Sequence, residues 1–127
     1  MRDDPRLIKA IAHFNEGDFD LAADDFEELF FEAVREEVPF VRALMQVATG
    51  IFHVQRNQLR AAMERLEEGV RAIDEIREDF GIDFVRLRAD VIALLPKIAA
   101  RSRGDRSRIE WPRLAEKEKP LNTDQRE

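Results

Sequence analysis

Residues 13–19 read HFNEGDF, and residues 53–59, forty positions later, read HVQRNQL. The two segments place Gly17 opposite Asn57, the two residue types that best tolerate the left-handed backbone conformation that ends a helix. The apolar positions that follow stay in phase without a gap, pairing Ala22 with Ala62, Phe26 with Leu66 and Phe30 with Val70. This internal repeat predicts two helical hairpins with equivalent turns.

Helical spacing of apolar residues continues outward from both turns. It predicts helices over residues 5–16, 18–35, 39–56, 58–80 and 84–95. Pro96 is expected to kink or stop the last helix, with residues 97–101 as a short continuation. No stretch alternates like a strand, so we predict an all-α fold, a compact array of about five helices with two repeated hairpins plus a C-terminal helix. The hairpins look like stacked tetratricopeptide repeats, although the repeat is longer than in that family.

The helices after the two turns separate apolar from charged side chains. Four large side chains are expected to face the core, namely Phe19, Phe26, Leu59 and Leu66. The carboxylates expected on the solvent side of the second helix are Asp20, Asp24, Asp25 and Glu28. We therefore predict a duplicated pair of antiparallel helices around one apolar interior.

The chain is long enough for one core, and we predict a single helical domain over residues 1–101. Residues 102–127 are charged and aperiodic, which is typical of a mobile tail. The alternative is an anchor against the helices formed by the apolar residues of this segment, Ile109, Trp111, Pro112 and Leu114.

Composition restricts the classes of function. The chain has no cysteine, which excludes disulfides, thiolate-bound zinc and thiol nucleophiles and fits a reducing compartment. Residues 1–14 lack the apolar run of a signal peptide or a membrane span, so we expect a cytoplasmic protein with no membrane partner. The acidic net charge of -6 argues against a nucleic-acid partner, because phosphate binding needs a basic surface.

The predicted helix over residues 39–56 is apolar except for one stripe. Its polar side chains are spaced four, three, four and three residues apart, at Arg42, Gln46, Thr49, His53 and Arg56. Such a stripe either faces solvent or lines a groove between neighbouring helices. Glu27 is expected near the inner edge of the preceding helix, where a partly buried carboxylate would reach the stripe and find a cationic partner.

No phosphate loop, nucleophile motif or set of three metal ligands is recognisable. We therefore predict no catalytic residue, no metal and no cofactor. Glu27 and His53 remain a candidate acid/base or anchoring pair within the same groove. The sequence does not exclude an enzyme, but it favours a protein without enzymatic activity.

Three stretches of the sequence, FNEGDF at residues 14–19, Glu27 with Phe30, and ALMQVA at residues 43–48 leading to His53, carry a family resemblance. Together they resemble the prokaryotic domain-of-unknown-function family numbered 309, over about residues 7–80. In that family a histidine precedes the glutamate by four residues and a tryptophan closes the motif, positions held here by Ala23 and Phe30. The positions that match are Asn15, Glu27, Gln46 and His53. The resemblance implies a compact helical fold with an uncharacterised role, and the replaced histidine argues against a metal site.

Two hypotheses from different classes follow. The first is a protein-interaction or self-association module that binds a protein partner or a second copy in a groove along the third helix. The residues of this candidate groove are Asn15, Glu27, Arg42, Gln46, His53 and Arg56. The alternative is a small enzyme or a ligand- or metal-binding protein that uses Glu27 and His53. An enclosed pocket would favour the alternative, and an open groove would favour the interaction module.

Overall fold

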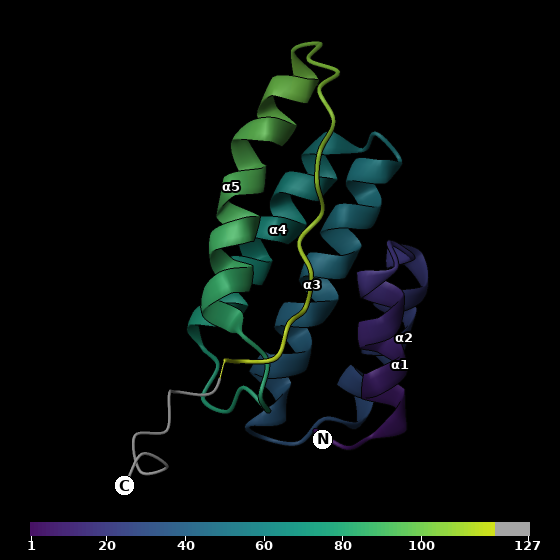
Figure 1. Cartoon of the computed structure of the whole chain (residues 1–127), viewed down its shortest axis with the longest axis vertical. Coiled ribbons are helices and arrows are strands. Elements are labelled where there is room, and N and C mark those ends of the chain that lie inside the picture. Colours follow the sequence, from purple (N-terminus) through teal and green to yellow (C-terminus); the bar gives the residue numbers. More distant parts are fainter. Residues whose placement is uncertain (119–127) are drawn as a thin grey trace, which may run out of the picture.

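The computed structural model describes residues 1–118, which form five α-helices and no strand. The helices are α1 (Pro5–Asn15), α2 (Phe19–Glu32), α3 (Glu37–Gln55), α4 (Leu59–Asp74) and α5 (Phe84–Ser102). Successive helices pack as neighbours, with α3 between α2 and α4 and with α5 against α4. Figure 1 shows α5 at one edge of this array and α1 with α2 at the other. The predicted all-α array is confirmed.

The two predicted turns have the same backbone hydrogen bonds. Gly17 has φ +86° and Asn57 has φ +58°, so both adopt the left-handed conformation. The amide of Asp18 donates to the His13 carbonyl at 2.9 Å, and the amide of Gln58 donates to the His53 carbonyl at 2.8 Å. These bonds satisfy carbonyl groups that a helix end otherwise leaves unpaired. The turn chemistry read from the repeat is therefore present at both positions.

Helix α3 is the centre of the core. Its buried side chains include Phe40, Val41, Leu44, Val47 and Ile51, all of them fully buried. Gly50 lets α4 approach closely, because a β-carbon at this position would lie 2.7 Å from Leu66 Cγ. The equivalent position in the first hairpin is Ala10, which is also buried. Small residues at this position bring the helices of each hairpin into contact.

Two predicted helix ends differ from the structure, that of α2, which ends at Glu32 and not at residue 35, and that of α4. Helix α4 ends at Asp74 and not at residue 80, because the chain reverses to place the Phe80 ring 4.8 Å from the Phe40 ring. Helix α5 continues through Pro96 to Ser102. A proline inside a helix costs about 3 kcal/mol, which burial of Leu94 and Ile98 on either side offsets.

The segment after α5 returns along the helices, as the yellow trace in Figure 1 shows. Ile109, Pro112 and Leu114 are buried, and the backbone pairs with the loop before α5 through an isolated bridge between Ile82 and Glu116. Residues 109–117 therefore pack against the helices and the loop before α5. The end of the predicted tail, residues 119–127, lies outside the described residues.

Candidate functional site

A groove of about 430 Å³ runs over α3. One wall is α2, which contributes Asp20, Ala23, Asp24 and Glu27. The base and the opposite side come from α3, through Met45, Gln46, Thr49, Phe52 and His53, and α4 adds Arg65. The groove is open, with carboxylates along one edge and apolar side chains along its base.

Three residues of the predicted polar stripe line this groove, namely Gln46, Thr49 and His53. The arginines at the two ends of the stripe do not. Arg42 stacks on the Phe30 ring at 5.5 Å from its centroid, and Arg56 stacks on the Phe52 ring at 5.7 Å. Contacts of this kind hold a guanidinium over an aromatic face. Arg56 therefore covers a ring that lines the groove, whereas Arg42 covers a ring outside it.

His53 is oriented by its own turn. Its Nδ1 lies 2.7 Å from Oε1 of Gln58, the residue that follows Asn57 in the left-handed turn. Because the amide oxygen only accepts, Nδ1 carries the proton in this contact, and Nε2 of the neutral ring is left as an acceptor. On the far side, Arg65 donates to Gln46 Oε1 at 3.3 Å. The polar groups of α3 are thus held by residues of α4 and of the turn before it.

Glu27 does line the groove, but it is exposed and not partly buried as expected. Asp20 and Asp24 are also exposed. Within residues 1–118, no cationic nitrogen lies within 4.0 Å of these three carboxylates. The wall therefore presents three negative charges to solvent without a cationic partner among the described residues.

Asn15, the remaining predicted groove residue, lies elsewhere and holds the C-terminal segment. Its side-chain amide donates to the Leu114 carbonyl at 2.9 Å and its side-chain oxygen accepts from the Leu114 amide at 2.7 Å. The Arg113 side chain in turn donates to the Asn15 carbonyl at 3.1 Å. One asparagine thus satisfies both polar groups of a residue 99 positions later in the chain.

A polar contact between α1 and α2 is not predicted by the sequence. His13 Nδ1 lies 2.7 Å from Asp25 Oδ2, and the Asp25 side chain is only 13% exposed. Lys9 Nζ lies 3.6 Å from the other oxygen of the same carboxylate. Asp25 is therefore not on the solvent side as predicted, and it joins the two helices of the first hairpin.

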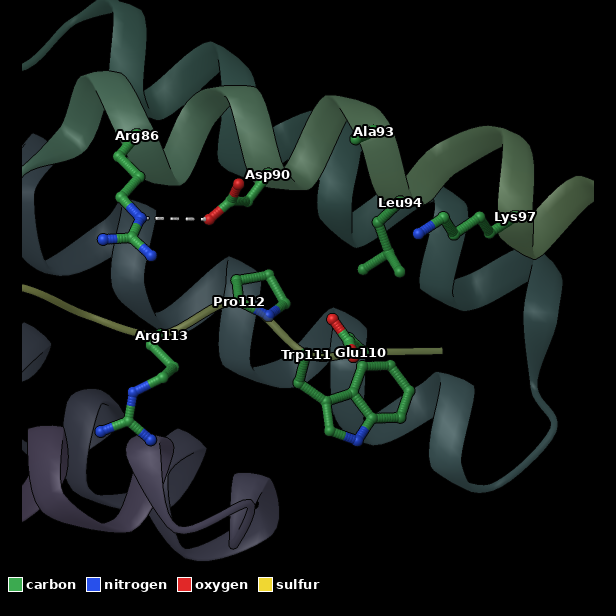
Figure 2. A pocket seen from close by; sticks show the side chains of 9 residues that line it. All are labelled: Arg86, Asp90, Ala93, Leu94, Lys97, Glu110, Trp111, Pro112 and Arg113. Atoms are coloured by element: carbon green, nitrogen blue, oxygen red, sulfur yellow. Dashed lines mark ion pairs between the residues drawn. The ribbon is translucent and has the colours of Figure 1, made fainter. Parts of the chain in front are cut away.

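A second cleft, of about 340 Å³, separates α5 from the C-terminal segment (Figure 2). Figure 2 shows Leu94 extending from α5 toward Trp111, with Arg86 and Asp90 paired further along the helix at 3.9 Å. Trp111 also meets the Phe19 ring edge-on at 5.9 Å. Cations and carboxylates both line this cleft, so it has no uniform charge. We regard it as the seam along which the segment packs.

Residues 1–118 contain no group of three or more His, Asp or Glu side chains arranged to hold a metal ion. No helix in this range is long and apolar enough to cross a membrane.

Residues 7–64 match the model of a family described as a domain of unknown function (DUF309). The match agrees with the family resemblance seen in the sequence. The match covers α1 to α3 and ends within α4, short of the residue 80 expected from the resemblance. No curated protein matches the chain. The groove lies over the DUF309 segment, and four positions of the resemblance, Ala23, Glu27, Gln46 and His53, all line it.

The groove residues that the sequence predicts come mainly from α3. The three-and-four spacing predicts Gln46, Thr49 and His53, and the inner edge of the second helix predicts Glu27, whereas Asp20 and Asp24 are expected in open solvent. The contribution of Arg65 follows only from the packing of α4 against α3.

Proposed function

We propose that the chain is a protein-interaction module that binds a basic, amphipathic segment in the groove between α2 and α3. The observation that carries this proposal is the combination of an acidic wall with an apolar base. Asp20, Asp24 and Glu27 stand along one edge, and the base contains Ala23, Met45 and Phe52.

Charge and shape determine the kind of partner. The carboxylates have no cation from the described part of the chain within ion-pairing distance, so a partner's Lys or Arg would gain contacts that the free protein lacks. An apolar stripe at helical spacing would cover Met45 and Phe52, which are partly buried and packed against the core. Arg65 and Gln46, joined at 3.3 Å, close one side of the groove.

The alternative function, an enzyme or ligand-binding protein, keeps one observation in its favour. Glu27 and His53 line the same groove, and the contact with Gln58 leaves Nε2 of the His53 ring as an acceptor. An acid/base pair works best where water is excluded, whereas Glu27 is exposed in an open groove. The interaction module is therefore the better supported of the two.

The test uses a labelled model peptide, an amphipathic helix with leucines on one face and lysines on the other. We expect fluorescence anisotropy to report binding that weakens as salt is raised, because surface ion pairs are screened. The control peptide replaces every lysine by glutamate and should not bind. Asp24→Lys should weaken binding of the lysine peptide, since Asp24 lies on the acidic wall.

A matched variant on another face is Asp90→Lys in α5, which lies outside the groove and should leave peptide binding unchanged. Equal binding of the lysine and glutamate peptides, or equal loss from both variants, would contradict the proposal. A cytoplasmic location, which the lack of cysteine fits, is part of the same proposal and can be checked by cell fractionation.

A further inference from the structure

The outer face of α5 is an apolar stripe without a cover among the described residues. Val85 is 84% exposed and Ile92 is 41% exposed, and Ala89 and Pro96 are exposed as well. Their spacing of four, three and four residues places them on one line along the helix. The opposite face buries Leu87, Val91, Leu94 and Ile98 in the core.

Helix α5 is at the edge of the array, where the outer face of a helix is usually polar. Among the helices, α5 packs chiefly on α4, and Figure 1 shows no helix beyond it. Stacked helical hairpins need polar outer faces on their terminal helices to remain soluble as monomers. Exposed apolar residues lined up on such a face indicate a surface for another chain.

The charges of α5 and α2 are complementary. Helix α5 carries four cations and one carboxylate, with Arg86 and Lys97 beside the stripe and on the side of the second cleft (Figure 2). Helix α2 carries six carboxylates and no lysine or arginine. Pairing two α5 helices symmetrically would bring together two surfaces of net positive charge, whereas pairing α5 with the acidic groove brings together opposite charges.

We propose that the occupant of the groove is α5 of a second copy of this chain. The apolar stripe of one copy covers Ala23, Met45 and Phe52 of the next, and Arg86 and Lys97 face the carboxylates of α2. Because α5 and α2 lie at opposite edges of the array, the contact is head-to-tail and each copy keeps one unused surface. This inference rests on the proposed function and names the partner of the same groove.

The test is sedimentation velocity on the full chain over a range of concentration and salt. We expect species heavier than the 14.8 kDa monomer that grow with concentration and dissociate as salt rises. Ile92→Glu removes the donor surface and Asp24→Lys removes the acceptor surface, and each variant alone should sediment as a monomer. Both positions are exposed in the monomer, and unchanged circular dichroism would verify the fold of each variant.

Mixing the two variants separates a head-to-tail contact from a symmetric one. The Asp24→Lys chain still offers an intact α5, and the Ile92→Glu chain still offers an intact groove, so an equimolar mixture should form a dimer that cannot grow further. A mixture that stays monomeric while the unmodified chain associates would overturn the inference and indicate a symmetric contact. An unmodified chain that is monomeric at all concentrations also overturns it.

The model peptide distinguishes this failure from failure of the proposed function. A monomeric chain that still binds the lysine peptide has an interaction groove whose partner is a different protein. A chain that neither associates nor binds the peptide contradicts both proposals.

Discussion

At the residue scale, nearby positions on α2 differ sharply in burial, and this burial sets how much each side chain contributes to stability. Phe26 is fully buried, Phe31 is 79% exposed, and Asp25 between the helices pairs with His13. Helical spacing identified Phe26 correctly but placed Asp25 on the solvent side, because spacing gives the angle of a side chain and not the partner it meets. Replacing Asp25 by Ala would accordingly remove a half-buried ion pair and is not expected to be neutral.

Phe26→Ala should lower the free energy of unfolding by about 3 to 5 kcal/mol, because it leaves a cavity among fully buried side chains. Phe31→Ala removes the same side chain from an exposed position on the same helix and should change stability by less than about 0.5 kcal/mol. Urea unfolding of both variants measures the difference. Similar losses from the two substitutions would mean that the buried face of α2 is misassigned.

At the element scale, the C-terminal segment behaves as a sixth packed element without being a helix. Asn15 holds it at Leu114, and at its far end the Lys117 amide donates to the Gly81 carbonyl at 2.6 Å. Its composition is charged and aperiodic, so a sequence pattern has no period by which to recognise it. Its apolar residues are buried because they pack against the helices, as Trp111 does against the Phe19 ring.

Asn15→Ala should detach the middle of this segment, since a Leu114 amide and carbonyl left without partners cost about 1 to 3 kcal/mol. Trp111, the one tryptophan of the chain, reports the change, and its emission should shift to the red as it leaves the Phe19 ring. The control is Gln55→Ala at the equivalent position of the second hairpin, where the side chain makes one hydrogen bond of 3.4 Å. No spectral difference between the two variants would refute the role of Asn15.

The end of the segment should also respond to acid. The Asp79 carboxylate accepts hydrogen bonds from Lys117 Nζ and from the Gly81 amide, both at 2.8 Å, and these contacts hold the pKa of Asp79 below its usual range. A carboxylate with a lowered pKa in the folded state stabilises it above the unfolded pKa of about 4 and ceases to do so as pH falls through the folded value.

The protection factors of the amides of Lys117 and Asp83, measured by NMR hydrogen exchange and corrected for the intrinsic pH dependence of exchange, should therefore fall below about pH 4. Other carboxylates titrate in the same range, so the informative quantity is the difference from Asp79→Asn. That variant should exchange faster at neutral pH and lose this part of the pH dependence. Identical pH profiles for the two chains would show that Asp79 does not hold the segment.

At the scale of the whole molecule, the array has two unlike edges joined by a common core. Helix α3 runs through the middle and is buried on most sides. It packs against α2 of the first hairpin and against α4 of its own hairpin. One edge carries the carboxylates of α2 and the other carries the apolar stripe and cations of α5. An array with complementary edges can extend by adding copies, whereas one with two polar edges would end.

A chain ending at residue 103 tests whether the helices form a domain without the returning segment. We expect it to keep its helical circular dichroism but to melt at a lower temperature, because burial of Ile109 and Leu114 contributes about 1.5 to 3 kcal/mol each. The full chain with the exposed Arg108 replaced by Ala should melt unchanged. An unfolded truncated chain would contradict the predicted domain of residues 1–101.

The sequence by itself determined the helices, the two equivalent turns and the side chains that face the core. These features are local, since helical period and the left-handed preference of Gly17 and Asn57 act between residues a few positions apart. The polar stripe on α3 is also a local pattern, and it predicted that Gln46 and His53 line the groove.

Only the tertiary structure decided where α4 ends, what Asn15 and Asp25 bind, and which carboxylates flank the groove. Each of these depends on contacts between residues distant in sequence, such as Phe80 with Phe40 and Asn15 with Leu114. A periodic pattern records which way a side chain points along its own helix. The group it meets is set by how the helices pack, because packing brings together side chains that no local rule relates.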